Sequence, residues 1–219
     1  LGSYGGNFFE NGEVAFNKRP GVEALSWMVN SMHKEKITAP ASISSSDHTN
    51  LNAFLGGEVP FHVNWDYAIS MLDNPELSKE WGVAPMPASG KGKPNVSILG
   101  IMSFGIAKGS KNKEKAADFL SFYVRKDVQK KVAMDLGFPP SIDAAYEEEV
   151  LAKYPAYESL YQTMLSAVGR PNSITWYPEF ALVLQEELHA ALVQKKAPQK
   201  ALDDAAKRID SLKTKYKGF

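Results

Sequence analysis

The sequence predicts an α/β protein whose last third is helical. Over the first two thirds, short runs rich in apolar and β-branched residues alternate with segments of helical periodicity. From residue 142 onward, apolar residues recur at three-to-four-residue spacing in one segment after another. With 219 residues, 44 % of them hydrophobic and 23 % charged, the chain can bury a sizeable core as one large domain or two modest lobes.

Helices in the first two thirds are predicted from apolar stripes and from residues that start or stop a helix. They cover residues 20–34, 51–55, 69–72, 113–125 and 127–136. Side chains between Ser44 and Asp47 can cap the second of these helices, and Gly56 with Gly57 stops it. Ser110 or Asn112 can cap the fourth, and Gly137 ends the fifth.

Three strands are predicted between these helices. Residues 59–63 read as a buried strand that delivers Asn64 to Tyr67 at its carboxyl end. A short strand begins at Trp81 and leads into an exposed loop of Pro, Gly and Lys. Residues 97–107 read as two strand pieces with a bend at Gly100, an element suited to passing between lobes.

The last third is predicted to hold helices at 142–153, 156–168, 180–194 and 198–215. The longest break between them is GRPNSITWYP, at residues 169–178. This non-repetitive loop holds Arg170, Trp176 and Tyr177, and it therefore stands out as a candidate for function.

The charge balance excludes a basic footprint for nucleic acid, because Lys plus Arg and Asp plus Glu both number 25. No apolar run reaches the ~18 residues of a membrane span, and no signal-peptide series is found. Because the chain begins at Leu1 and reads like the middle of a protein, that second absence is compatible with an exported precursor. The lack of cysteine excludes disulfides and thiolate chemistry.

The ionisable residues predict neither a metal site nor a cofactor. The histidines are scattered without metal-ligand spacing; they are His33, His48, His62 and His189. A glycosidase needs two carboxylates roughly 5 to 9 Å apart. Asp66 is a candidate for one of them, but the sequence shows no evident partner.

The stretch FHVNWDYA, residues 61–68, is the most informative local feature. Trp65 and Tyr67 flank Asp66 directly after an apolar run. Flat rings can cover the C–H face of a pyranose while a carboxylate between them accepts its hydroxyls, so the stretch is interpreted as a sugar cradle. The alternative is a strand end capped by core aromatics.

A series of stretches follows the order of a known family. They are YGGNFFENGEVAFN from Tyr4, GVEAL from Gly21, AFLGGEVPFHVNWDYA from Ala53, GVAPMP from Gly82, LGIMSFGIAKGSKNKEKAADFLSFY from Leu99, GFPPS from Gly137, and YPEF with LQEELHAAL from Tyr177. Single pieces are weak signals, whereas their common order is specific. Over essentially its whole length the chain resembles the carboxyl-terminal part of a family 1 extracellular solute-binding protein of an ABC transporter, similar to the maltose, trehalose and multiple-sugar binders.

The resemblance implies a type II periplasmic-binding-protein-like fold, in which two α/β lobes close on a ligand at a hinge. Residues 1–102 would form the first part of the second, carboxyl-terminal lobe. Residues 103–147 would belong to the first lobe, and residues 148–219 would return to the second lobe as its closing helices. Such proteins usually exceed 300 residues, so the resemblance implies that the amino-terminal part of the parent protein is absent.

The same resemblance places sugar-stacking aromatics at Trp65 and Tyr67. Relatives often have proline where this chain has Asp66, which accepts a sugar hydroxyl or caps the helix that follows. Gly100 lets the backbone approach the ligand or bend at the hinge. Met102 replaces the family's usual tryptophan, which exchanges a stacking platform for an adaptable thioether contact.

Further ligand contacts are implied in the rest of the chain. Arg170 matches an arginine that can reach the sugar with its fork of donors, with a surface salt bridge as the alternative. Of Trp176 and Tyr177, one ring would face the cleft and the other would pack. Gly6 and Asn7 match a segment that lines the cleft, although the glycine pair there also suits a tight turn.

Together these features predict a binding module without enzymatic activity, which delivers a mono- or oligosaccharide to the permease subunits of an ABC transporter. Its partners would be the carbohydrate, the permease and a complementary amino-terminal lobe, and this chain alone would bind weakly. It would act in the periplasm or at the extracellular face of the membrane, held there only by the permease or a lost lipid anchor. The alternatives are a glycan-acting enzyme with Asp66 as its acid, and a fragment that only pairs with its missing half.

Overall fold

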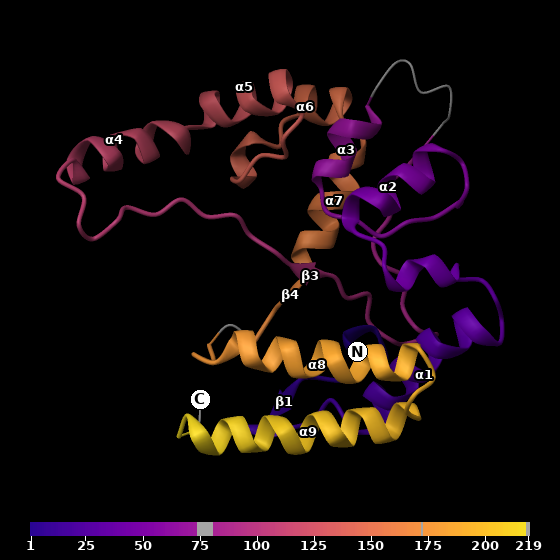
Figure 1. The fold of residues 1–219 in the computed structure, drawn as a ribbon. Coiled ribbons are helices and arrows are strands. Elements are labelled where there is room, and N and C mark those ends of the chain that lie inside the picture. Colours follow the sequence, from indigo (N-terminus) through magenta and orange to yellow (C-terminus); the bar gives the residue numbers. More distant parts are fainter. Residues whose placement is uncertain (74–80, 172, 218–219) are drawn as a thin grey trace. The chain divides into compact units, whose positions relative to one another are not determined.

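A computed structural model describes residues 1–73, 81–171 and 173–217 (Figure 1). The chain divides into two compact units. The terminal unit comprises Leu1–Ser45, Met86–Leu99 and Ser166–Phe219, and the central unit comprises Ser46–Pro85 and Gly100–Leu165. Each unit has buried apolar clusters of its own.

The terminal unit is built around α1 (Arg19–His33), α8 (Tyr177–Leu192) and α9 (Pro198–Lys215), and Figure 1 shows α8 and α9 side by side. Each of these helices has a proline in its first turn, where a backbone N–H has no partner to lose. Their apolar stripes meet in one core, which includes Phe16, Leu25, Trp176, Phe180, Leu202 and Ile209. The helices predicted at 20–34, 180–194 and 198–215 are therefore confirmed.

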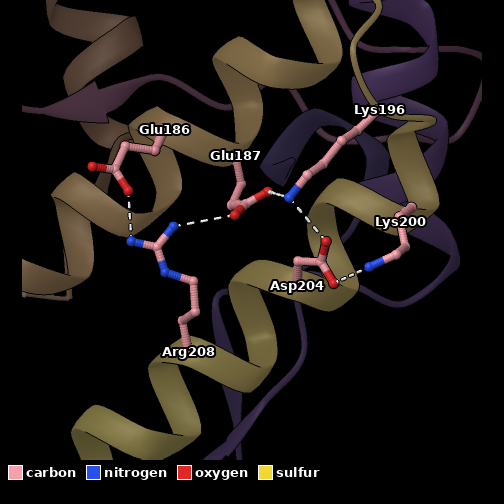
Figure 2. Close-up of polar contacts among 6 residues, drawn as sticks. All are labelled: Glu186, Glu187, Lys196, Lys200, Asp204 and Arg208. Atoms are coloured by element: carbon pink, nitrogen blue, oxygen red, sulfur yellow. Dashed lines mark hydrogen bonds and ion pairs between the residues drawn. The ribbon is translucent and has the colours of Figure 1, made fainter.

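Ion pairs join α8 to α9 and to the loop between them (Figure 2). Glu187 is 7 % exposed, and its carboxylate lies 2.5 Å from Lys196 Nζ and 3.1 Å from Arg208 Nη1. The other members of this network are Glu186, Lys200 and Asp204. A buried carboxylate is costly unless it is paired, so the two cations are what allow Glu187 to sit at the helix interface.

Short strands complete the terminal unit. The hairpin of β1 (Phe9–Glu10) and β2 (Glu13–Val14) is antiparallel. Its turn residues Asn11 and Gly12 have φ of 52° and 80°, and this left-handed pair matches the twist of the flanking strands.

A second pair of strands is parallel, and short 3₁₀ helices lie near both pairs. β3 (Ile98–Leu99) runs beside β4 (Val168–Gly169), with Ile98 opposite Val168. The 3₁₀ helices of this unit are η1 (Gly2–Tyr4) and η2 (Pro40–Ile43).

The central unit is mostly helical. Its elements are α2 (Asp47–Leu55), α3 (Tyr67–Leu72), α4 (Lys113–Tyr123), α5 (Lys126–Leu136), η3 (Asp143–Ala145), α6 (Glu148–Lys153) and α7 (Ala156–Leu165). A capping box starts α2: the Ser46 hydroxyl accepts the Thr49 N–H at 3.2 Å, and the Thr49 hydroxyl accepts the Ser46 N–H at 2.7 Å. Gly137, with φ of 68°, ends α5 as predicted.

The core of the central unit lies between α3, α5, α6 and α7. Its buried members include Ile69, Ala133, Val150, Tyr154 and Tyr157, and the Tyr154 and Tyr157 rings stack with centroids 4.9 Å apart. A smaller cluster joins α2 to α3 through Leu51, Ala68 and Leu72. By contrast, α4 has no buried residue.

The predicted strands at 59–63 and from Trp81 onward are not formed, and of the segment 97–107 only residues 98–99 pair as a strand. Phe61 and Val63 are instead 88 % and 65 % exposed. A strand is stable only when a neighbour takes up its N–H and C=O groups. In the part of the chain that the structure describes, Val168–Gly169 provides such a neighbour for Ile98–Leu99 alone among the predicted strands.

Further boundaries differ from the sequence prediction. The helix expected at 156–168 ends at Leu165, and Val168 instead pairs in β4. The helix expected at 142–153 is divided into η3 and α6, which are separated at Tyr146 and Glu147. The lobe boundaries expected at 102 and 147 also differ from the boundaries of the compact units, because residues 46–85 group with 100–165. Compactness within this chain is a different property from lobe membership in a longer relative, so the lobe assignment stays a prediction.

Candidate functional site

The residues predicted to bind a ligand are distributed over both units. Those in the central unit are Trp65, Asp66, Tyr67, Gly100 and Met102. Those in the terminal unit are Gly6, Asn7, Arg170, Trp176 and Tyr177. Within the central group, Gly100 lies against the exposed indole ring of Trp65.

Hydrogen bonds to α2 hold the backbone that leads into Trp65. Asn64 Oδ1 accepts the Trp65 N–H at 2.8 Å, and Asn64 Nδ2 donates to the Asp47 carbonyl at 3.0 Å. Asn50 Nδ2 donates to the Val63 carbonyl at 2.9 Å. Two asparagine side chains therefore tie this segment, which forms no strand, to the first turns of α2.

The Trp65 ring packs against the backbone of Gly100. A Cβ at Gly100 would lie 2.6 Å from Cζ3 and 2.9 Å from Cη2 of the ring. Trp65 still keeps 38 % of its surface exposed, which leaves ring surface for stacking. Met102 lies two residues after Gly100 in the sequence. It is 98 % exposed, so its thioether is accessible.

Asp66 presents an exposed carboxylate at the N-cap position of α3. Its side chain makes no capping hydrogen bond, so the capping alternative is not what the structure shows. Its charge acts on nearby phenols: burial first and Asp66 second raise the pKa of Tyr146 to about 12. Burial, neighbouring tyrosines and Asp66 also raise the pKa of Tyr157.

Tyr67 lies mostly on the inner side of this element. Its ring is 5.6 Å from that of His48 and packs against the cluster of α2 and α3. Its hydroxyl is buried and has no hydrogen-bond partner among the described residues, as is also true of Tyr146 and Tyr157. The structure therefore separates the two predicted stacking rings, because Trp65 is exposed whereas Tyr67 packs inward.

In the terminal unit, Trp176 belongs to the core. It is 1 % exposed, stacks on Tyr216 with 9° between the ring planes, and meets Phe180 edge-on. The prediction that one ring of the Trp176–Tyr177 pair packs is met by Trp176, and a direct ligand contact for it is not supported. Tyr177 keeps partial exposure at the start of α8.

Gly6 also has a packing role. A Cβ there would lie 2.6 Å from Leu1 Cδ1 and 2.8 Å from Pro20 Cβ, so a side chain would disturb the contact between the amino terminus and α1. Asn7 beside it is exposed, and Arg170 is exposed directly after β4. Asn7 and Arg170 thus keep accessible polar groups, whereas Gly6 is explained by packing.

Two other kinds of site find no support in the described parts of the chain. Residues 1–73, 81–171 and 173–217 contain no group of three His, Cys, Asp or Glu side chains that could hold a metal ion. No helix in these residues is long and apolar enough to cross a membrane.

Comparison with known proteins places this arrangement in a family. The model of the bacterial extracellular solute-binding protein family matches residues 3–159. The chain belongs to this family. A relative named "Probable ABC transporter-binding protein", from Deinococcus radiodurans, is 28 % identical over 210 residues, which cover 92 % of this chain and 49 % of the relative. The sn-glycerol-3-phosphate-binding periplasmic protein UgpB of Yersinia pestis is 30 % identical over 146 residues, covering 62 % of this chain and 33 % of the relative.

Solved structures of solute-binding proteins share the fold. The maltose-bound MalE3 of T. maritima aligns with a TM-score of 0.85 at 29 % identity, over 96 % of this chain and 55 % of that structure. The expected type II periplasmic-binding-protein fold is therefore confirmed. The chain spans about half the length of the Deinococcus radiodurans relative and of MalE3.

Sequence reasoning missed the residues that position Trp65. The apolar run that ends at Asn64 gives this residue no role, although an asparagine directly before a tryptophan can accept its N–H. Gly100 was assigned to a ligand approach or a hinge, and the close approach that it permits is that of the Trp65 ring. That pairing spans 35 positions of sequence, and no local pattern reveals it.

Proposed function

We propose that this chain is part of the substrate-binding component of an ABC importer and that its ligand is a mono- or oligosaccharide. The observation that carries this proposal is the Trp65 ring, which packs on Gly100, keeps 38 % exposure and adjoins the exposed Asp66 carboxylate. The ring can cover a sugar's C–H face, and the carboxylate can accept hydroxyls beside it. Family membership and the fold shared with a maltose-bound relative support the same conclusion.

The charge at this site favours a neutral, hydroxyl-rich ligand over a phosphorylated one. The carboxylate of Asp66 would repel a phosphate placed beside it. The named sn-glycerol-3-phosphate binder among the relatives makes that ligand the second candidate.

The remaining contacts follow from a two-lobe mechanism. We propose Arg170, Asn7 and Tyr177 as further polar and aromatic ligand contacts, and Met102 as a thioether contact. A complementary amino-terminal lobe, like the half of each relative that this chain does not match, would supply the opposite wall and close on the ligand. The closed form would dock on the permease subunits in the periplasm or at the extracellular face, with the permease or a lipid anchor as the link to the membrane.

We further propose that the chain is not an enzyme. A glycosidase would need a second carboxylate across the scissile bond from Asp66. The test is incubation with aryl glycosides, for which no hydrolysis is expected. Turnover that disappears in Asp66→Asn would replace the transport proposal with the enzymatic one.

Calorimetric titration tests the binding proposal. Maltose and trehalose are expected to bind the 219-residue chain more weakly than micromolar and to bind more tightly once the complementary amino-terminal lobe is added. Trp65→Ala should abolish the heat of binding, whereas Trp27→Ala, which removes a 55 % exposed tryptophan from α1, should not change it. Micromolar binding by the chain alone would contradict the two-lobe mechanism, and binding of sn-glycerol-3-phosphate instead of sugars would contradict the carbohydrate assignment.

A further inference from the structure

We infer that Asn64 and Gly100 are positioning residues that together fix the Trp65 ring as the stacking surface of the central unit. This inference rests on the proposed function, because the Trp65 ring is the proposed sugar contact. It adds a role for Asn64, and it reassigns Gly100 from contact with the ligand to support of the ring.

Asn64 fixes the backbone from which the ring projects. Its carboxamide bridges the Asp47 carbonyl at the start of α2 and the Trp65 N–H, at 3.0 and 2.8 Å. The Ser46–Thr49 capping box in turn orders that end of α2. Residues 59–63 form no strand. The tryptophan is therefore positioned by a capped helix rather than by a sheet.

Gly100 fixes the orientation of the ring. Heavy atoms of a side chain and a neighbouring ring do not approach as close as the 2.6 and 2.9 Å that a Cβ at Gly100 would impose on Cζ3 and Cη2. A third ring atom, Cε3, would be 3.5 Å away, so three adjacent atoms of the six-membered ring of the indole approach the glycine. Any side chain at this position must either displace the ring or move the backbone of residue 100.

The same segment offers a matched control. Gly105 lies five residues further on, and a Cβ there would meet nothing within 4 Å. Gly100→Ala and Gly105→Ala reduce backbone freedom to the same extent. Only the first of these variants places a methyl group against atoms of the Trp65 ring.

Fluorine NMR of the chain labelled with fluorotryptophan tests the inference. The chain has 4 tryptophans, and the Trp65 resonance is identified by its absence from Trp65→Phe. Trp81 packs against both clusters of the central unit and reports whether that unit is folded, and the buried Trp176 does the same for the terminal unit.

The expected result is a shift or broadening of the Trp65 resonance in Gly100→Ala and Asn64→Ala, with the Trp81 and Trp176 resonances unchanged. Gly105→Ala should leave all of them unchanged. Asn64→Asp keeps the acceptor for the Trp65 N–H and loses the donor to Asp47, so its effect should fall between those of Asn64→Ala and the parent chain. If Gly100→Ala disturbs folding, Asn64→Ala and Asn64→Asp test the same ring without a steric change.

Titration of the labelled chains with maltose separates this inference from the proposed function. A sugar-dependent shift of the Trp65 resonance should need roughly three to ten times more maltose in Gly100→Ala than in the parent, the loss expected for one weakened aromatic contact. If maltose moves no resonance in any chain, the proposed function fails, while the variant spectra still decide the positioning roles. An unchanged Trp65 resonance in both Gly100→Ala and Asn64→Ala would overturn the inference, because the backbone would then have moved in place of the ring.

Discussion

Apolar residues are buried in the α8–α9 hairpin of the terminal unit. They are exposed in the segment of the central unit that runs from Gly100 to the end of α4. In the hairpin, Phe180 is 2 % exposed and Ile209 is fully buried. In the second region, Phe104 and Phe119 are 67 % and 54 % exposed, and α4 has no buried residue. Both regions are apolar enough in sequence to form a core. A local apolar pattern is therefore sufficient to form a helix, whereas the burial of its apolar side chains depends on a partner element.

We expect the largest difference in stability when one apolar residue is replaced in each region. Ile209→Ala removes a fully buried side chain from the terminal core and should lower the free energy of unfolding by about 2–5 kcal/mol. Phe119→Ala should cost about 0.5 kcal/mol or less, because the ring is more than half exposed. Urea unfolding followed by circular dichroism measures both values. Equal losses would show that α4 is packed in solution.

The ion pairs of the hairpin provide the next test. Glu187→Ala removes a buried carboxylate from Lys196 and Arg208 and should cost about 1–3 kcal/mol, since each cation keeps one other acidic partner. The matched control is Glu186→Ala, which removes a half-exposed partner of Arg208 and should cost less than about 1 kcal/mol. The same unfolding measurement ranks the two, and a larger loss for Glu186→Ala would contradict the role given to burial.

Acidification should weaken the hairpin through Asp204. Hydrogen bonds from Lys200 and Lys196 lower its pKa from 3.8 to about 2. Because the folded-state pKa is depressed, the stabilisation by Asp204 is present above about pH 3.8 and is lost as the pH falls toward 2. The stability difference between the parent and Asp204→Asn should therefore shrink over that window.

The smallest expected effect is a change in the pKa of Tyr146, which packs in the central unit. Asp66→Asn should lower the pKa of Tyr146 from about 12 while leaving it above 10, because burial is the larger of the two causes. Ultraviolet titration of the phenolate, with Tyr146→Phe subtracted, measures this change. An unchanged pKa would place Asp66 too far away to act on the tyrosine. Since the folded-state pKa is raised, the associated stabilisation is complete below pH 10 and is lost as the pH rises to about 12.

Helices were the most predictable part of this chain. The helix predicted at residues 198–215 is found as Pro198–Lys215, because a proline starts it and an apolar stripe continues to its end. Residues 59–63 carry an equally clear apolar pattern, but a strand depends on a neighbour that may lie anywhere in sequence, and none is found beside it among the described residues. The sequence therefore predicted the elements that complete their own hydrogen bonds.

The candidate site was predictable in composition but not in orientation. In the NWDY stretch Trp65 and Asp66 are exposed, as a sugar cradle requires, and their contact with a ligand stays a prediction. Which of Trp176 and Tyr177 packs depended on Tyr216, which approaches from the far end of α9 and stacks on Trp176. The support that Gly100 gives to Trp65 likewise comes from a residue distant in sequence. Orientation at both places is set by long-range packing that local patterns do not encode.

The exposed segment from Gly100 to Ala107 also affects how the protein behaves at high concentration. This segment exposes Ile101, Phe104 and Ile106 and contains no proline or charged residue. Such a composition is typical of an aggregation-prone strand. Lys108, Lys111 and Lys113 follow directly. Positive charges that flank such a strand repel a second copy aligned with it, so these lysines act as gatekeepers against self-association.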